Sequence, residues 1–238
     1  MRKTFIKRPL QSVSLVVVAL CLCPPASAQQ GRGAQKKTPP RGKVIAELPL
    51  RPDAGRVVGS TYANDYFGFQ LTIPEGWRVA DNAASRQLNE DGAALVAGDS
   101  AERREQLREA VAKNVNLITM GKMITAASGA SESVVLIVGA EAVPAWLIKT
   151  PQEYIGQARR LLQSSAMKVN VAEGTRSETI GGVEFAVLDV SSEQPGMVVR
   201  QHYYATLKKG YALFIISTFA SEPAAQAIGE VLKTVKFK

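Results

Sequence analysis

Residues Tyr62 to Val79 read YANDYFGFQLTIPEGWRV, and this segment alternates apolar and polar side chains before it closes on a turn. Its apolar positions share one face of a strand that is covered on one side: Phe67, Phe69, Leu71 and Ile73. Pro74-Glu75-Gly76 has the composition of a turn. Trp77 is expected to be a core anchor beneath it, with ligand stacking as the alternative. The segment predicts a sheet protein and says nothing of a reaction.

Helices and strands follow in the middle of the chain. Ser100 precedes an amphipathic helix over 101–114, whose charged residues at helical spacing are typical of a solvated face. Asn116–Thr125 and Ser133–Gly139 are expected to be strands, joined by a small polar loop. The sequence Thr150-Pro151-Gln152-Glu153 has the hydroxyl, proline and carboxylate of a capping box, so it predicts a helix that begins near Pro151.

Past Lys168 the pattern predicts strands joined by tight turns. The turns are Gly181-Gly182, Gln194-Pro195-Gly196 and Lys209-Gly210, and the strands are Val183–Ser191, Val198–Leu207 and Tyr211–Phe219. Short connections force antiparallel neighbours, and the last strand is apolar on both faces, which favours a central position. Ser221 starts a closing helix, and Val235–Phe237 is expected to be a short strand or docked tail. The sequence therefore predicts an α+β domain, with an antiparallel sheet of about six to seven strands flanked by helices.

The first 28 residues have the parts of a secretory signal peptide. Four basic residues precede the apolar run Val13–Cys23, and Ala26-Ser27-Ala28 supplies small residues for cleavage. The run is much shorter than the ~20 residues needed to cross a membrane, so no transmembrane segment is expected in the mature chain. Lipid attachment at Cys21 or Cys23 is the alternative, but a leucine precedes each. We expect cleavage near Ala28 and a periplasmic or extracellular location.

Both cysteines lie in the segment that cleavage removes, so the mature chain can form no disulfide. The remaining 210 residues are enough for one domain with its own core. The pattern predicts three parts: a signal peptide over 1–28, a flexible basic linker over 29–57 and a folded domain over 58–238.

The distribution of charge argues against nucleic-acid binding. Of 29 Lys and Arg residues, four lie in 1–28 and seven in 29–57, which leaves 18 in 58–238 against 19 Asp and Glu. The expected domain is therefore nearly neutral and lacks the one-signed surface that a phosphate backbone requires. The linker is rich in Gly, Gln, Pro and Lys, which is typical of a flexible tether. Contact of its charges with anionic lipid or cell wall is the functional alternative.

Four segments together are similar to one known family. They read YANDYFGFQLTIPEGWRV, IGGVEFAVLDV, VVRQHYYATLKKGYALFIIST and LKTVKF. The chain from Tyr62 to Phe237 resembles the PsbP-like family, named for an extrinsic protein of photosystem II, whose fold is also seen in a nuclear-import factor that binds the GTPase Ran. The resemblance implies an α/β/α sandwich in a protein that binds or assembles others without catalysis. No residue matching a manganese-cluster or Ran contact is present, so neither role is carried over.

Few residues have the pattern of a reactive site. His202 is the one histidine of the chain, so a catalytic triad or multi-histidine metal site would have to be built around it. Asn89-Glu90-Asp91-Gly92 lacks the ligand series of a calcium loop and predicts a polar turn. We expect no catalytic residue, metal or cofactor. The best candidate contact surface is the polar face of one strand, with Arg200, His202 and Tyr204; the alternative is that a helix covers this face.

These observations favour an exported, non-enzymatic domain that binds another protein or an envelope component. One alternative is a small-molecule or lipid carrier, with a pocket between sheet and helix lined by Trp146, Phe185 and Phe214. A second alternative is a hydrolase that uses surface carboxylates, since two carboxylates can suffice for glycoside hydrolysis.

Overall fold

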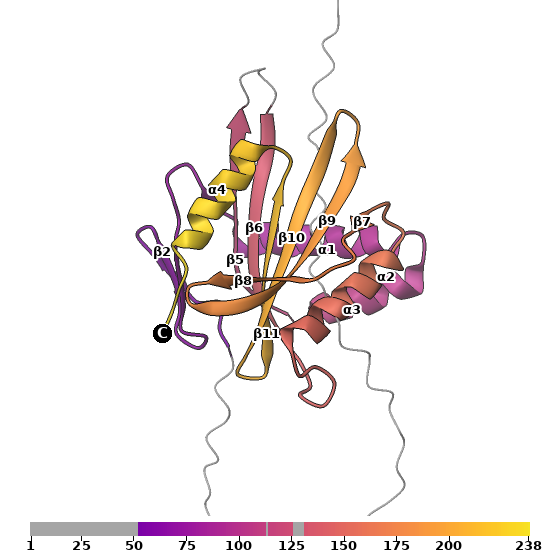
Figure 1. Cartoon of the computed structure of the whole chain (residues 1–238), viewed down its shortest axis with the longest axis horizontal. Helices are drawn as coiled ribbons and strands as arrows, with labels where there is room; N and C mark the ends of the chain where they lie inside the picture. The colour runs from indigo at the N-terminus through magenta and orange to yellow at the C-terminus, as the bar shows by residue number, and fades with distance from the viewer. Residues whose placement is uncertain (1–51, 113, 126–130) are drawn as a thin grey trace, which may run out of the picture.

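The computed structural model describes residues 52–112, 114–125 and 131–238 (Figure 1). Within these ranges the chain forms four helices: α1 (Asn82–Ala97), α2 (Ala101–Val111), α3 (Pro151–Gln163) and α4 (Glu222–Lys233). It also forms twelve strands: β1 (Arg56–Val58), β2 (Thr61–Asn64), β3 (Phe69–Thr72), β4 (Arg78–Val79), β5 (Val115–Thr125), β6 (Ser131–Ala142), β7 (Asn170–Val171), β8 (Arg176–Ile180), β9 (Val183–Gln194), β10 (Met197–Lys208), β11 (Tyr211–Phe219) and β12 (Lys236–Phe237). The expected signal peptide and all but the end of the expected linker lie outside the described residues.

The strands form two antiparallel sheets. The larger sheet has eight strands in the order β4-β5-β6-β11-β10-β9-β7, with β8 also paired to β9. The smaller sheet has the order β1-β2-β3-β12. The α+β class predicted from the sequence is confirmed. The number of strands exceeds the expected six to seven because several strands have only two or three residues, too few to show a periodic pattern.

Helices and the smaller sheet cover the two faces of the larger sheet. Figure 1 shows α4 on the left of the molecule, α2 and α3 on the right, and α1 running behind the strands toward them. One apolar core joins α4 and the segment from β2 to β4 to one face of the larger sheet. A second core joins α1, α2 and α3 to the opposite face. The aromatic anchor Trp77 and the alternating residues before it are buried in the first core, as predicted.

Strand β11 contributes to both cores. Leu213 and Ile215 lie in the core on the α4 side, and Phe214 and Ile216 lie in the other. Its position between β6 and β10, in the middle of the sheet, confirms the prediction from its two apolar faces.

Side-chain caps begin three of the four described helices where the sequence places them. At α3 the hydroxyl of Thr150 accepts a hydrogen bond from the Glu153 amide at 3.1 Å, and the Glu153 carboxylate accepts one from the Thr150 amide at 3.3 Å. The hydroxyl groups of Ser100 and Ser221 also accept a backbone hydrogen bond and cap α2 and α4, without the second bond of a capping box. The Glu132 carboxylate of β6 also accepts hydrogen bonds from the amides of residues 220 and 221 and from the Ser221 hydroxyl, which ties β6 to the start of α4.

Helix α1 was not predicted, and the expected polar turn over Asn89–Gly92 is wrong. These residues lie inside α1, whose N-cap is Asp81. The buried residues of this helix are mostly small or polar: Ser85, Asn89, Gly92, Ala93, Val96 and Ala97. Because most of these side chains are not strongly apolar, they produce no apolar stripe that would identify a helix from the sequence.

The described fold begins before residue 58, where the sequence places the end of the linker. Arg56 of β1 already pairs with Ala63 of β2. The Asn64 side chain donates a hydrogen bond to the Asp53 carbonyl at 2.8 Å, and the Tyr62 hydroxyl donates one to the Ala54 carbonyl at 2.9 Å. In the described part of the chain, no helix combines the length and apolar character needed to cross a membrane.

The contact between β6 and β11 provides a test of the packing. Gly139 lies opposite Phe214, and a methyl group added at Gly139 would collide with the Phe214 ring. We therefore expect Gly139→Ala to lower the free energy of unfolding by about 1–3 kcal/mol, the usual effect of overpacking. Gly174→Ala is the matched control, because nothing lies within 4 Å of its added methyl. Urea denaturation monitored by circular dichroism measures both. Equal stability of the two variants would contradict the packing described here.

Candidate functional site

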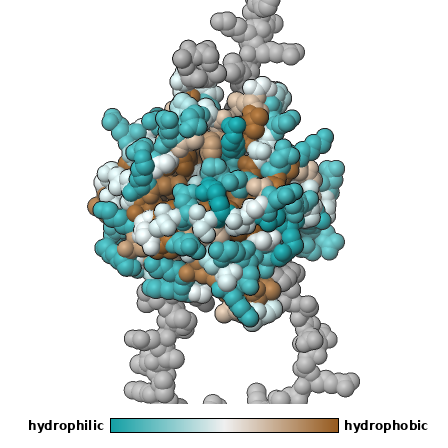
Figure 2. Space-filling view, in the orientation of Figure 1, coloured by the Kyte–Doolittle hydropathy of each residue, from teal (hydrophilic) through white to brown (hydrophobic). Residues whose placement is uncertain are grey.

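The predicted polar face of β10 lies on the same side of the larger sheet as α4. Tyr204 belongs to the core under α4, whereas Arg200, nearer the β9–β10 turn, is exposed. Helix α4 and the smaller sheet therefore cover one end of this strand face and leave the other end open. Figure 2 shows this side of the molecule, where polar residues surround apolar patches.

Tyr204 is not part of a contact surface, because it is only 3% exposed. Burial raises the pKa of its hydroxyl to about 12. The prediction that Tyr204 contacts a partner is therefore wrong, and the alternative of a covered face holds for this residue. Tyr204 instead supports its neighbour His202, whose Nδ1 lies 3.1 Å from the Tyr204 hydroxyl.

His202 has a polar neighbour at each of its two ring nitrogens. Its Nε2 lies 3.5 Å from Oδ1 of Asp189, its partner across the strand pair. The ring also packs edge-on against Phe219, with 4.9 Å between centroids. A neutral imidazole with the proton on Nε2 suits both polar neighbours, since its N–H then faces the Asp189 carboxylate and its Nδ1 accepts from the Tyr204 hydroxyl. The side chain is 27% exposed, so one part of the ring stays open to solvent.

Arg176 of β8 completes a network of charges around Asp189. Its guanidinium donates two hydrogen bonds to the two Asp189 oxygens, at 3.1 and 3.2 Å, and a third to Glu178 at 2.6 Å. Burial lowers the pKa of Arg176, but the hydrogen bonds to the two carboxylates outweigh it and raise that pKa overall. The bidentate geometry fixes the direction of the Asp189 carboxylate toward the sheet.

The sequence pattern did not identify Arg176, Glu178 and Asp189 as site residues. The two glycine-containing turns were a usable signal, because a tight turn sets the register of the strands that it joins. The turn at Gly181-Gly182 places Ile180 opposite Val183, and the next turn places Asp189 opposite His202.

A shallow hollow opens beside this network. It has a volume of about 340 Å³ and is lined by residues of β7 and its following residue, β9 and β10: Asn170, Val171, Ala172, Asp189, Val190, Ser191, Arg200 and His202. We call it the polar hollow. Arg200 is fixed at its rim by a hydrogen bond of 3.1 Å to the Ala220 carbonyl before α4. The hollow thus presents hydrogen-bond donors and acceptors held in place by the sheet.

Three residues on neighbouring strands beside the polar hollow have the side-chain types of a catalytic triad. Asp189, His202 and Ser217 are successive partners on β9, β10 and β11. Ser217 is completely buried at 0% exposure, and the Nδ1 of His202 is turned to Tyr204. Because a nucleophile must reach its substrate and the base must reach the nucleophile, this row does not have the geometry of a triad.

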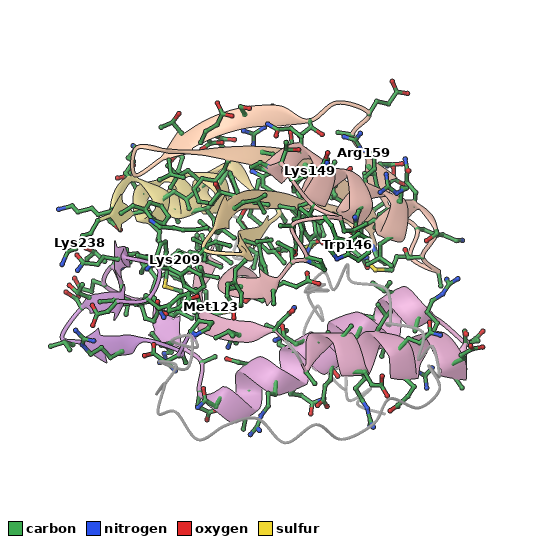
Figure 3. The ribbon with its side chains drawn as sticks, turned by 90° about the horizontal axis from the view of Figure 1, so that it is seen from below. Met123, Trp146, Lys149, Arg159, Lys209 and Lys238 are labelled. Carbon is green, nitrogen blue, oxygen red and sulfur yellow. The ribbon has the colours of Figure 1, made fainter. Side chains whose placement is uncertain are left out.

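The aromatic residues proposed for a carrier pocket do not line one cavity. Phe185 lies in the core on the α4 side, and Phe214 lies in the core on the other side of the sheet. Trp146 is 77% exposed on the segment before α3 (Figure 3). That prediction is wrong because strand periodicity alone does not give the face that each aromatic residue takes.

Comparisons with known proteins assign no function. No family model and no curated protein matches the chain. A solved structure from Bacteroides thetaiotaomicron has a TM-score of 0.43 and 10% identity over 76% of this chain, which spans about half (48%) of that protein. LpqN of Mycobacterium tuberculosis, described as involved in cell envelope biogenesis, has a TM-score of 0.41 and 12% identity, covering 71% of this chain and 83% of its own. Cyanobacterial PsbP from Synechocystis has a TM-score of 0.44 and 12% identity, covering 80% and 100%.

The last of these structures is a PsbP protein, of the family that the sequence resembles. All three TM-scores are below 0.5, so we transfer neither partner nor activity from these proteins. Among the described residues, no three His, Cys, Asp or Glu side chains are grouped as a metal ion would require.

The histidine can be tested directly, because the chain has a single imidazole to observe. Burial lowers the pKa of His202 below its ordinary 6.5, while Asp189 opposes this shift. An NMR titration of the untagged protein should therefore give a midpoint below 6.5, and Asp189→Asn should lower it further. The unfolded chain binds this proton more tightly, so the free energy of unfolding should fall as the pH drops from above 6.5 toward the folded midpoint.

His202→Gln removes that proton-linked contribution and should flatten the pH dependence over the same window. The pH dependence of stability that remains in this variant comes from the carboxylates, which titrate at lower pH, so the variant serves as their control. A midpoint at or above 6.5 in the wild-type protein would contradict the environment described for His202.

Proposed function

We propose that this protein is an exported, non-enzymatic binding domain that holds a partner protein or envelope component in the polar hollow. The observation that carries the proposal is the half-open strand face, on which Arg176, Asp189 and His202 are fixed by one another while Arg200 remains exposed. Such a surface has few side-chain motions to lose when a partner binds.

The charges of the polar hollow favour a polar partner with both donors and acceptors. Arg200 offers a positive charge at the rim, and Asp189 offers a carboxylate that Arg176 already holds in place. A partner whose contacting groups all carry the same sign of charge would be repelled by either Arg200 or Asp189. This gives selectivity without a high net charge on the surface. An apolar ligand fits this surface poorly, because it would remove these polar groups from water without replacing their hydrogen bonds.

The position of the hollow also favours a macromolecular partner. It is open to solvent at an edge of the larger sheet, where the short strand β7 is the last strand in the order. A partner can therefore contact the polar face of β10 and the edge strand at the same time. Small-molecule sites are usually deeper and mainly apolar.

A photocrosslinking experiment tests this proposal. A photoreactive amino acid replaces Glu193, which is exposed on β9 opposite Val198 and near the hollow without lining it. The control protein has the same group at Glu102, an exposed residue of α2. In cells that produce the full chain, we expect an adduct of one defined mass from position 193 that is missing from position 102.

The double change Arg200→Ala and His202→Gln should reduce that adduct severalfold at unchanged protein level and thermal stability. A matched variant, Arg103→Ala with Gln106→Ala on α2, should leave it unchanged. Identical adducts from positions 193 and 102, or an adduct insensitive to the Arg200 and His202 changes, would reject the polar hollow as the binding site.

A further inference from the structure

A second hollow lies at the other end of β10. It has a volume of about 190 Å³ and is formed where the turn after β10 meets the smaller sheet. Three lysines line it: Lys208 at the end of β10, Lys209 in the turn and Lys238 after β12. We call it the lysine hollow. It is six residues along β10 from His202, or ~20 Å, so it is separate from the polar hollow.

Contacts with aromatic rings and a carbonyl position two of the ammonium groups. The Lys209 ammonium donates a hydrogen bond of 2.6 Å to the Tyr66 carbonyl and lies 5.0 Å from the centre of the Tyr66 ring. The Lys208 ammonium lies 4.6 Å from the centre of the Phe237 ring. Lys209 also has a backbone φ of +53°, a conformation that favours glycine or asparagine, so the turn keeps a lysine at some conformational cost.

Among the described side chains that line the lysine hollow, three lysines face a single carboxylate, Asp65, whose pKa is lowered by the hydrogen bond and charge of Arg56 and, less strongly, by the charge of Lys238. None of the three lysines forms an ion pair with a described carboxylate. The one acidic residue of the lining, Asp65, makes an ion pair of 2.6 Å with Arg56. Burial and the neighbouring charge of Lys209 lower the pKa of Lys208, as expected where like charges converge.

From this arrangement we propose that Lys208, Lys209 and Lys238 bind a phosphate group, carried by a lipid headgroup or present as free phosphate. Lysine ammonium groups bind phosphate as point charges, and the volume admits a compact tetrahedral anion. Gln70 at the same hollow supplies an amide that can donate a further hydrogen bond. Figure 3 shows Lys209 and Lys238 at the same end of the molecule, with Lys149 at a distance from them.

The entry of the chain into the domain is consistent with either source. Arg56, the partner of Asp65, begins β1 and belongs to the basic segment 29–57 of the sequence. Basic residues next to a phosphate site strengthen attraction to an anionic membrane, by about 1 kcal/mol for each charge near the surface. Free phosphate would need only the lysine hollow itself.

The test compares two variants with the same change in net charge. Lys208→Gln with Lys209→Gln alters the hollow, and Lys149→Gln with Lys233→Gln alters two exposed lysines elsewhere. Inorganic phosphate is titrated into the full chain at constant ionic strength, and amide chemical shifts around Gly68 and Gly210 are followed by NMR. We expect saturable shifts in the wild type and the control pair. In the hollow pair, the affinity for phosphate should fall by about tenfold or more, the effect of losing at least one charged hydrogen bond.

Vesicle sedimentation distinguishes the two sources. Vesicles of phosphatidylcholine alone are compared with vesicles that also contain phosphatidylglycerol. The site is assigned to a lipid headgroup if the hollow pair loses binding to the anionic vesicles and the control pair keeps it, while inorganic phosphate gives a weak response or none. Saturable phosphate binding without vesicle binding assigns it to free phosphate. If neither probe binds, or if both pairs lose binding equally, the proposal is overturned.

Discussion

The burial of β11 on both faces is the constraint on which the rest of the structure depends. Its side chains alternate between the core under α4 and the core under α1, α2 and α3. Any shift of one residue in its register would move Leu213 and Phe214 into each other's core. The closeness of Phe214 to Gly139 fixes the neighbouring strand in the same way. Both layers therefore take their positions from a single strand.

The polar residues are arranged along β10 because the α4 layer covers only part of that strand. Tyr204 lies under this layer and His202 lies at its border, whereas Arg200 is in the open. At the other end, Lys208 and Lys209 emerge where the strand turns beside the smaller sheet. Near one end of β10, charges of both signs from β8, β9 and β10 lie together, whereas positive charge is in excess at the other end. The near-neutral composition of the domain conceals this separation.

The sequence was informative where local chemistry decides the structure. The Thr150–Glu153 box and the two apolar faces of β11 predicted a helix start and a central strand that the structure confirms. It was uninformative where tertiary contact decides. Helix α1 buries Ser85 and Asn89, so its inner face has no apolar stripe. Arg200, His202 and Tyr204 share one strand face, as the alternation predicts, but the sequence does not show that Tyr204 is covered. Arg176 reaches Asp189 only through the register of the turn at Gly181-Gly182.

The pairing of β12 with β3 brings the last described residues onto one of the first strands. Figure 1 shows the C-terminus close to β2. Helix α4, which precedes β12 directly, supplies part of the core on that side of the sheet. A nascent chain that extends only as far as β11 therefore cannot close this core, since the helix and strand that complete it come later in the sequence. Until α4 and β12 have been synthesised, Phe69 and Leu71 stay available to any factor that binds unfolded nascent polypeptides.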